Sequence, residues 1–250
     1  MSGISAAAAL TPGKVQSWRR RVFDKCYENM STDVAKTASM AERSEKNLNE
    51  LTLLYGEMEY SALVDIFSRV NKFYTEARLQ KKDLNFVDLG CGTGKTVVGA
   101  ALCGEAFASC HGVEILEQLL AMAGKATAIF EESKRAMPEF GNHDNSKTTL
   151  VFEAGDITEY DLADADVAMA NSTGFDQPLM KKIAKQASKM KAGSIFITSS
   201  YRLPTASFEV VETFESLQSW GTATIFIHKK LSKKEALMAR LARSASGNKF

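Results

Sequence analysis

The stretch of sequence that decides the fold of this 250-residue chain is Asp88-Leu89-Gly90-Cys91-Gly92-Thr93-Gly94-Lys95-Thr96. It follows a short apolar run at residues 85–89 and precedes a small apolar run at residues 96–102, which is the order of a strand, a turn and a helix. Glycines in such a turn let the backbone approach a nucleotide-like ligand closely. The stretch therefore predicts a ligand-binding turn inside a parallel α/β sheet.

Three classes of ligand compete for a glycine-rich turn, and the residues of this one separate them. A phosphate-binding G-x-x-x-x-G-K-[ST] loop needs glycine where Leu89 stands, although Gly94-Lys95-Thr96 supplies its end. A dinucleotide fingerprint G-x-G-x-x-G needs glycine where Lys95 stands. The remaining pattern, D-x-G-x-G-x-G, is typical of enzymes that use S-adenosylmethionine, and we predict this cofactor.

Acidic residues at the ends of three successive predicted strands support the same cofactor. Asp88 ends the first strand, Glu114 ends the second, and Asp156 follows the third. These acids would repel a pyrophosphate, whereas S-adenosylmethionine carries a sulfonium, an ammonium, a ribose diol and an adenine amine. We expect Asp88 near the ammonium and Glu114 at both ribose hydroxyls. Asp156 is expected at the adenine amine, with Ile157 against the ring; each acid taken alone could instead be a turn or cap residue.

The rest of the chain continues the alternation of strands and helices. Strands are predicted at 110–115, 149–154, 167–170 and 194–198, and helices at 15–54 in two or three pieces, 61–79, 116–137 and 177–190. Two β-rich segments, 208–214 and 223–228, predict a closing hairpin. The pattern predicts a Rossmann-like α/β fold with the seven-stranded sheet of class I methyltransferases. We divide the chain into a helical N-terminal extension (1–54), a methyltransferase domain (55–228) and a basic C-terminal tail (229–250).

Composition and charge exclude several other classes of protein. The chain is 45% hydrophobic and 24% charged, which is typical of a soluble globular protein, and no apolar run reaches the roughly 20 residues that cross a bilayer. Four cysteines and three histidines lack zinc-ligand spacing, so we predict no metal site. The formal net charge is only +1, yet the last 22 residues carry about +6. An Arg run at residues 19–21 is compatible with either a surface helix or an organellar targeting segment.

The end of the fourth predicted strand restricts the methyl acceptor. It reads Asn171-Ser172-Thr173-Gly174-Phe175, at the position that faces the transferred methyl group in class I folds. Nucleic-acid amine methyltransferases place N-P-P-[YF] there, so that the amide grips the base amine and the aromatic ring stacks on the base. This chain has the asparagine without either proline, and Gly174 stands in place of the aromatic. A nucleic-acid base is therefore a weakened alternative as acceptor.

Several short elements, in this order, resemble histone-lysine methyltransferases of the disruptor-of-telomeric-silencing type, the family without a SET domain. The resemblance covers roughly residues 54–228. The elements that carry it are Tyr55-Gly56-Glu57, the glycine turn with the strand before it, Gly112-Val113-Glu114, Gly155-Asp156-Ile157, the segment 171–175, and Met190-Lys191-Ala192-Gly193 with the strand that follows.

The resemblance implies roles for individual residues. The loop 55–58 would fold over the methionine part of the cofactor, with Glu57 available to its ammonium, and Asn171 and Phe175 would border the channel that admits a lysine. Ser172 and Thr173 stand where the family has an asparagine and an aromatic residue, so the channel wall is altered. We assign the catalytic site to Asn171, Tyr55 and Phe175. The residues predicted to bind the cofactor are Tyr55, Gly56, Glu57, Met58, Asp88, Gly90, Cys91, Gly92, Gly94, Lys95, Glu114, Asp156, Ile157 and Asn171.

The resemblance and the residues together predict methyl transfer from S-adenosylmethionine to a lysine side chain of a protein substrate, with a histone or nucleosome among the candidates. The alternatives are a nucleic-acid base or small-molecule methyltransferase and a noncatalytic partner protein with this fold. The basic tail is expected to contact nucleic acid or an acidic surface, with an apolar face that docks as a helix, and no membrane partner is expected. The predicted location is nuclear or cytoplasmic, with organellar import left open.

Overall fold

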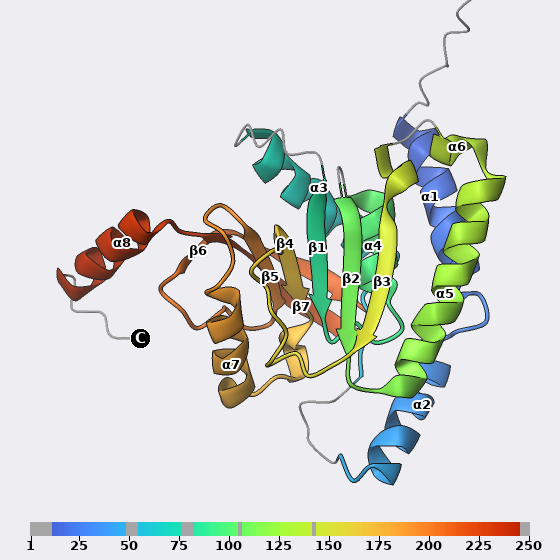
Figure 1. The fold of residues 1–250 in the computed structure, drawn as a ribbon, viewed down its shortest axis with the longest axis horizontal. Coiled ribbons are helices and arrows are strands. Elements are labelled where there is room, and N and C mark those ends of the chain that lie inside the picture. Colours follow the sequence, from blue (N-terminus) through green and yellow to red (C-terminus); the bar gives the residue numbers. More distant parts are fainter. Residues whose placement is uncertain (1–11, 49–54, 77–82, 105–106, 142–143, 246–250) are drawn as a thin grey trace, which may run out of the picture.

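The computed structural model describes residues 12–48, 55–76, 83–104, 107–141 and 144–245. At its centre is a twisted sheet with the strand order β3-β2-β1-β4-β5-β7-β6 (Figure 1). The first five strands are parallel, and β7 is antiparallel to both β5 and β6. The strands are β1 (Leu84–Leu89), β2 (Phe107–Glu114), β3 (Thr149–Ala154), β4 (Val167–Ala170), β5 (Ile195–Ser199), β6 (Phe208–Gln218) and β7 (Gly221–Lys230).

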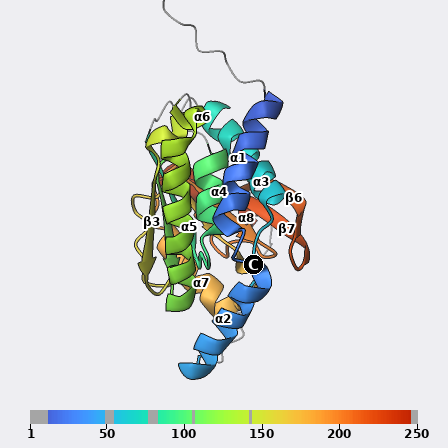
Figure 2. The same cartoon turned by 90° about the vertical axis from the view of Figure 1, so that its right-hand side faces the viewer.

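Helices cover both faces of the sheet. Figure 2 shows α1, α3, α4 and α5 gathered together. Their buried residues pack in one core cluster, whereas those of α7 belong to a second cluster on the other face of the sheet. The helices of the described residues are α1 (Pro12–Tyr27), α2 (Thr32–Glu45), α3 (Tyr60–Glu76), α4 (Lys95–Cys103), α5 (Glu117–Ala136), α6 (Pro138–Gly141), α7 (Gln177–Ala187) and α8 (Lys233–Ala245), with short 3₁₀ turns η2 (Asp144–Lys147) and η3 (Ser172–Gly174). None of these helices combines the length and the apolar character needed to cross a membrane.

Alternation along β1 explains why both faces of the sheet are covered. Successive side chains of a strand point to opposite faces. Phe86 therefore packs among α3 and α4, with its ring 5.4 Å from that of Phe67, while Val87 and Leu89 face α7 and contact the cluster that includes Ile183. A strand buried on both sides reads as a continuous apolar run, and this is why β1 was visible in the sequence.

The predicted fold class is confirmed, with a longer closing hairpin than the sequence suggested. The predicted strand at 149–154 matches β3, and the one at 167–170 matches β4. In the hairpin, pairing continues from Phe208↔Lys230 to Gln218↔Gly221. Polar residues dominate the far half of β6, and its register shifts between Val210 and Glu212, so the apolar alternation ends before the hydrogen-bonded ladder does.

The N-terminal helices are part of the main core. Trp18 of α1 is 1% exposed and meets Phe140 edge to face at a centroid distance of 4.6 Å, and Val22 and Cys26 are also buried. Helix α1 contacts α4 and α5, and α2 contacts α5. The predicted helical extension thus packs on the sheet's own helices. Its proposed boundary at residue 54 lies outside the described residues and stays a prediction.

The C-terminal tail forms a helix, as its pattern suggested, but its apolar face does not dock. Helix α8 extends away from the sheet (Figure 1). Leu237, Met238 and Leu241 are 58%, 60% and 57% exposed, whereas Leu231, just before the helix, is buried. The expectation that the apolar face of the helix packs against the domain is wrong for these three side chains.

Candidate cofactor and acceptor site

The glycine turn closes tightly over the end of β2. The amides of Gly90 and Cys91 both donate to the carbonyl oxygen of Val113, at 2.9 and 3.0 Å. Gly92 has a φ of +54°, and a Cβ placed there would lie 2.7 Å from the Tyr55 ring. A side chain at this position would therefore strain the backbone and displace Tyr55. The turn can exist in this shape only with glycine at residue 92.

A pocket of about 420 Å³ lies beside the glycine turn, at the carboxyl ends of β1, β2 and β4. Ligands of open α/β sheets bind at this edge. The residues that line it are Ser39, Leu48, Tyr55, Gly56, Glu57, Met58, Asp88, Gly90, Cys91, Gly92, Thr93, Lys95, Thr96, Glu114, Ile115, Leu116, Leu119, Gly155, Asp156, Ile157, Thr158, Asn171, Phe175, Asp176, Pro178, Leu179 and Lys182. The structure thus brings together nearly all of the residues predicted from the sequence, from five separate segments.

Asp88 is a buried acid at the base of this pocket. It is 2% exposed, and burial, reinforced by the Glu114 carboxylate, raises its pKa to about 8, against the opposing effect of a hydrogen bond from Thr96. Its negative charge is poorly compensated by the protein. A cation bound beside it would supply the missing compensation, which is the role expected of the cofactor's ammonium.

Glu114 is held by three backbone amides. One carboxylate oxygen accepts from Gly92 N at 2.9 Å, and the other accepts from Ile115 N at 2.8 Å and Leu116 N at 3.0 Å. Burial raises its pKa, although these three bonds act in the opposite direction. A carboxylate offers about four lone-pair positions, so three donors leave room for about one more hydrogen bond.

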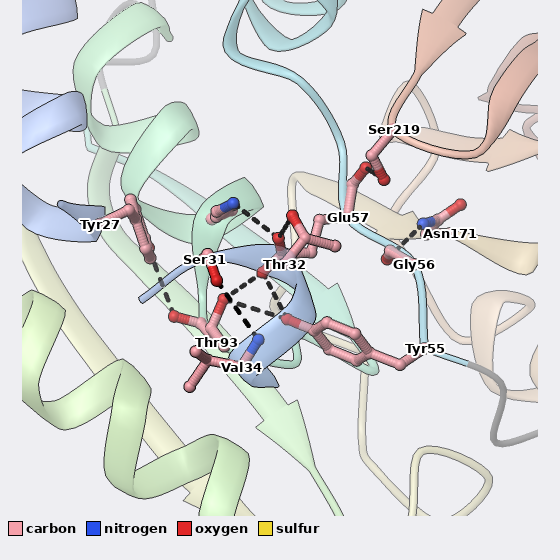
Figure 3. Close-up of polar contacts among 11 residues, drawn as sticks. Tyr27, Ser31, Thr32, Val34, Tyr55, Gly56, Glu57, Thr93, Asn171 and Ser219 are labelled. Atoms are coloured by element: carbon pink, nitrogen blue, oxygen red, sulfur yellow. Dashed lines mark hydrogen bonds and ion pairs between the residues drawn. The ribbon is translucent and has the colours of Figure 1, made fainter. Parts of the chain in front are cut away.

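Glu57 is the centre of a polar cluster that joins three segments (Figure 3). Its Oε1 atom accepts from Tyr55 at 2.5 Å and from Thr93 at 2.9 Å, and its Oε2 atom accepts from Lys95 at 2.6 Å and from Thr32. Burial alone would raise the pKa of Glu57, but Lys95 and the hydroxyl donors lower it below its ordinary range.

The saturation of Glu57 differs from the expected role. All four lone-pair positions of the carboxylate are filled by the protein itself, so no position remains for the cofactor's ammonium in this arrangement. Lys95, also expected to bind the cofactor, serves as the counter-ion of Glu57. The structure therefore gives both residues the task of holding the loop 55–58 against the glycine turn, which leaves Asp88 as the acid available to the ammonium.

Tyr55 packs on the glycine turn as a neutral phenol. Its hydroxyl donates to Glu57 and lies 3.2 Å from the Thr93 hydroxyl. Burial and then the Glu57 carboxylate raise its pKa above the ordinary value. A phenol that is held neutral and already donates its proton cannot serve as a base. We therefore interpret Tyr55 as a wall of the pocket.

Asn171 lies at the end of β4 with its amide fixed at both ends. Its Nδ2 atom donates to the Gly56 carbonyl at 3.2 Å (Figure 3). Its Oδ1 atom accepts from the Ser199 hydroxyl at 2.7 Å. Ser199 is itself fully buried. Phe175 lines the same pocket, and its ring tip lies 3.9 Å from the position of a Cβ on Gly90.

The residues that depart from the family pattern form hydroxyl contacts on β5. Ser172 donates to the Ser199 carbonyl at 2.7 Å, and the Thr173 hydroxyl contacts those of Ser199 and Ser200 at 3.2 and 2.9 Å. These contacts hold the start of η3 against β5 behind Asn171. The hydroxyl contacts of Ser172 and Thr173 thus stand in place of the asparagine and the aromatic residue that are typical of the family.

Asp156 and Ile157 lie on the far side of the pocket, after β3. One carboxylate oxygen of Asp156 accepts from the Thr158 amide at 2.7 Å, and no protein donor to its second oxygen is found among the described residues. Ile157 is partly buried against the α7 side of the core. The pair can thus offer an acceptor and an apolar surface, as an adenine ring would need.

Gly94 is the one predicted cofactor residue that does not line the pocket. Its φ is +82°, and a Cβ there would lie 2.6 Å from the Phe152 ring of β3. The residue permits close packing at the N-terminus of α4. The predicted contact with the cofactor is therefore not supported for Gly94, whose glycine is required by the core.

Several residues that line the pocket were not predicted from the sequence. Thr93 bonds to Glu57, Ser39 comes from α2, and Lys182 comes from α7. Thr93 stood inside the quoted turn and could have been found by its position. Ser39 and Lys182 carried no signal, because only the tertiary fold brings α2 and α7 to the strand ends.

The lining suits a cationic nucleoside. Acids at the ends of β1 and β2 and after β3 face the pocket, while the cation nearest to the glycine turn, Lys95, is already paired. With the strand order and the glycine turn, this arrangement defines the class I S-adenosylmethionine-dependent methyltransferases. The sequence profile of the histone methylation protein DOT1 family matches residues 46–224, and the chain belongs to this family. The predicted class and cofactor are thereby confirmed.

Solved structures that are similar to this chain have low sequence identity to it. The rRNA methyltransferase aviRa from Streptomyces viridochromogenes has a TM-score of 0.50 and 14% identity, over 74% of this chain and 89% of that protein. TrmN from Thermus thermophilus gives 0.48 and 14%, over 76% of this chain and 53% of that one, so the chain spans about half its length. An RNA methyltransferase from Salinibacter ruber in complex with S-adenosyl-L-homocysteine gives 0.44 and 17%, over 66% and 92%.

Proposed function

We propose that this protein transfers a methyl group from S-adenosylmethionine to the side-chain amine of a lysine in a protein, and that the acceptor is a histone. The observation that carries the proposal is Asn171, whose amide is locked by Gly56 and Ser199 at the edge of the acid-lined pocket, beside Phe175. An oriented amide and an aromatic ring suit a slender aliphatic amine. The family match to a histone methylation protein supports the histone as acceptor.

Methyl transfer requires the protein to orient the lysine amine toward the methyl group and to exclude water from the amine. The cofactor's sulfonium supplies an electrophilic methyl group, which the neutral amine displaces in line. With an ordinary pKa of about 10.4, only about 0.04% of lysine is neutral at pH 7, and the apolar walls disfavour the charged form. Asn171 can hold the amine with its remaining amide hydrogen or lone pair.

The described residues of the pocket offer no well-placed general base. Tyr55 is held as a neutral phenol, and Glu57 is saturated by its four donors. Asp88 lies buried beneath the glycine turn, on the side assigned to the cofactor. We propose that water removes the proton of the incoming lysine. The rate then depends mainly on how Asn171 orients the lysine amine.

The basic tail is proposed to hold an acidic surface of the substrate. Lys233 and Lys234 begin α8 and are exposed, and the helix extends away from the sheet (Figure 1). Nucleosomal DNA or the acidic face of a histone complex would be attracted to such a helix, and a histone acceptor implies a nuclear location. Removal of residues 233–250 should weaken nucleosome binding and reduce its dependence on salt, without changing cofactor affinity.

The experiment that tests this function is methyl transfer to defined acceptors. Purified protein is incubated with methyl-tritiated S-adenosylmethionine and, separately, with core histones, nucleosomes or total RNA, and the products are hydrolysed and separated. Tritium in Nε-methyllysine from histones is expected, and the Asn171→Ala variant should produce much less. Tritium in modified nucleosides, with none in lysine, would contradict the proposal and favour a nucleic-acid acceptor.

A further inference from the structure

Ser39 of helix α2 lines the pocket and has an unsatisfied hydroxyl. Its side chain is fully buried, its Oγ atom has no hydrogen-bond partner within the described part of the chain, and the residue lines the pocket. Buried hydroxyls in proteins are nearly always paired, because an unpaired one loses its bonds to water without replacement. A lone buried hydroxyl on a residue that lines a ligand pocket therefore indicates a bond that a ligand completes.

The position of α2 is fixed by a contact one turn further along the same face. Glu42 accepts from the backbone amides of Glu117 and Gln118, both at 2.8 Å, and so caps the N-terminus of α5. Lys46 compensates the charge of Glu42 at 2.7 Å. Below this contact, Ala35 packs with Leu116 and Leu119. Helix α2 is therefore a rigid wall of the pocket, next to the loop that follows β2.

This placement puts Ser39 on the side of the pocket where the carboxylate of Glu114 lies. Leu116, which donates its amide to Glu114 at 3.0 Å, also belongs to the apolar cluster that contains Ala35, one turn before Ser39 on α2. Residue 39 lies outside the segment 46–224 that matches the family profile. Nothing in the glycine turn or the strand ends required a contribution from α2.

The hydrogen-bond capacity of Glu114 leaves one ribose hydroxyl without a partner. Three backbone amides already occupy the carboxylate, so it can accept about one further hydrogen bond. The ribose of the cofactor presents two hydroxyl groups. The earlier expectation that Glu114 accepts from both exceeds the capacity that the structure leaves it, and the second hydroxyl needs another partner.

We propose that Ser39 is a cofactor-binding residue, and that its hydroxyl pairs with the ribose hydroxyl that Glu114 cannot satisfy. The inference rests on the use of S-adenosylmethionine in the proposed function and extends the cofactor site to a helix near the N-terminus. The bond satisfies two groups at once, the orphaned serine and the second ribose hydroxyl. Helix α2 thus contributes to the cofactor site, and both α2 and β2 contact the nucleoside part of the cofactor.

The test measures binding and stability separately. Titration calorimetry with S-adenosylhomocysteine is done on the wild-type chain and on the Ser39→Ala variant, and thermal unfolding is followed without ligand. Loss of one hydrogen bond should raise the Kd about tenfold. The unfolding midpoint of the empty protein should stay level or rise, because alanine removes an unpaired hydroxyl and favours the helix. A serine with only a structural role would show the opposite: a lower midpoint and an unchanged Kd.

A matched control and two ligand analogues complete the experiment. Ser133 of α5 is equally buried, but its hydroxyl is already paired with the Ile129 carbonyl at 2.8 Å, so Ser133→Ala should leave the Kd unchanged. The 2′-deoxy or the 3′-deoxy analogue of S-adenosylhomocysteine should bind the wild type and Ser39→Ala equally. An unchanged Kd for Ser39→Ala, or an equal penalty with all three ligands, overturns the role of Ser39 alone. Failure of the wild type to bind any of the ligands overturns the proposed function as well.

Discussion

The Nζ atom of Lys95, at the start of helix α4, lies 2.6 Å from the Oε2 atom of Glu57 in the loop before helix α3. The pair is largely shielded from water, with side chains that are 17% and 4% exposed. It joins the glycine turn to the loop that covers the pocket, and Thr32 adds the start of α2 to the same carboxylate. Three chain segments therefore depend on one ion pair for their relative positions.

Replacing Lys95 with methionine should destabilise the protein strongly. The substitution leaves the Glu57 carboxylate buried without its counter-ion, which typically costs about 3 kcal/mol when one partner of a buried pair is removed. Urea unfolding of Lys95→Met against the wild type measures this difference.

Lys189 provides the control for that substitution. Its ammonium lies 3.8 Å from Asp161, with both side chains about half exposed or more, so Lys189→Met should cost under about 0.5 kcal/mol. If the two variants unfold at the same urea concentration, the ion pair of Glu57 has no special role in the loop.

Gly92→Ala should reduce cofactor affinity. The backbone at residue 92 has a φ of +54°, and the new Cβ would meet the Tyr55 ring at 2.7 Å, so the glycine turn and its covering loop must separate. A cost of about 1–3 kcal/mol in the bound conformation corresponds to roughly a tenfold to hundredfold higher Kd for S-adenosylhomocysteine.

The same exchange at Gly124 tests whether alanine itself is harmful. Gly124 lies within α5, and a Cβ there meets nothing within 4 Å. Gly124→Ala should stabilise the protein by about 0.5–1 kcal/mol through helix propensity and leave the Kd unchanged. Equal Kd values for the two alanine variants would argue against the close approach of turn and ligand.

Asn171→Ala should reduce turnover more than cofactor binding. The amide is oriented by Gly56 and Ser199 at the acceptor end of the pocket, so its loss disturbs the alignment of the amine. We expect kcat to fall about tenfold to hundredfold, with the Kd for S-adenosylhomocysteine within about threefold of the wild type. Asn71→Ala removes an amide that bonds to the Cys103 carbonyl, outside the pocket lining, and should spare both values. Equal losses of kcat and affinity in Asn171→Ala would contradict the assignment.

Cofactor affinity should rise with pH between 6.5 and 8. Burial raises the pKa of Asp88 to about 8 in the free protein, so its carboxyl group is largely protonated at pH 6.5. A bound cation favours the carboxylate and lowers that pKa, so binding releases a proton in this range. The Kd for S-adenosylhomocysteine should be about tenfold lower at pH 8 than at pH 6.5. A Kd that is constant, or that falls on acidification, would remove Asp88 from the ammonium site.

The fold could be predicted because its signals are local. The central strands β1, β4 and β5 are mainly apolar runs that are buried on both faces, and glycines or acids stand at the ends of β1, β2 and β3. Because parallel strands place their carboxyl ends together, Asp88, Glu114 and Asp156 could be assigned to one pocket from the sequence alone.

The partners of those residues could not be predicted, because they depend on side chains that are distant in sequence. Glu57 is satisfied by Lys95 and Thr32, at separations of 38 and 25 residues. A carboxylate's free capacity can be counted only when all its donors are known. The same limit applies to Ser39, whose significance lies in the partner that it lacks within the described chain.

Calorimetric titration of the purified full chain with S-adenosylmethionine tests the central claim most directly. The account predicts saturable binding of one molecule per chain, with an affinity that Gly92→Arg abolishes by filling the space beside Tyr55. Absence of binding heat in the wild type, confirmed by an unshifted unfolding midpoint at a saturating concentration of the cofactor, would contradict it.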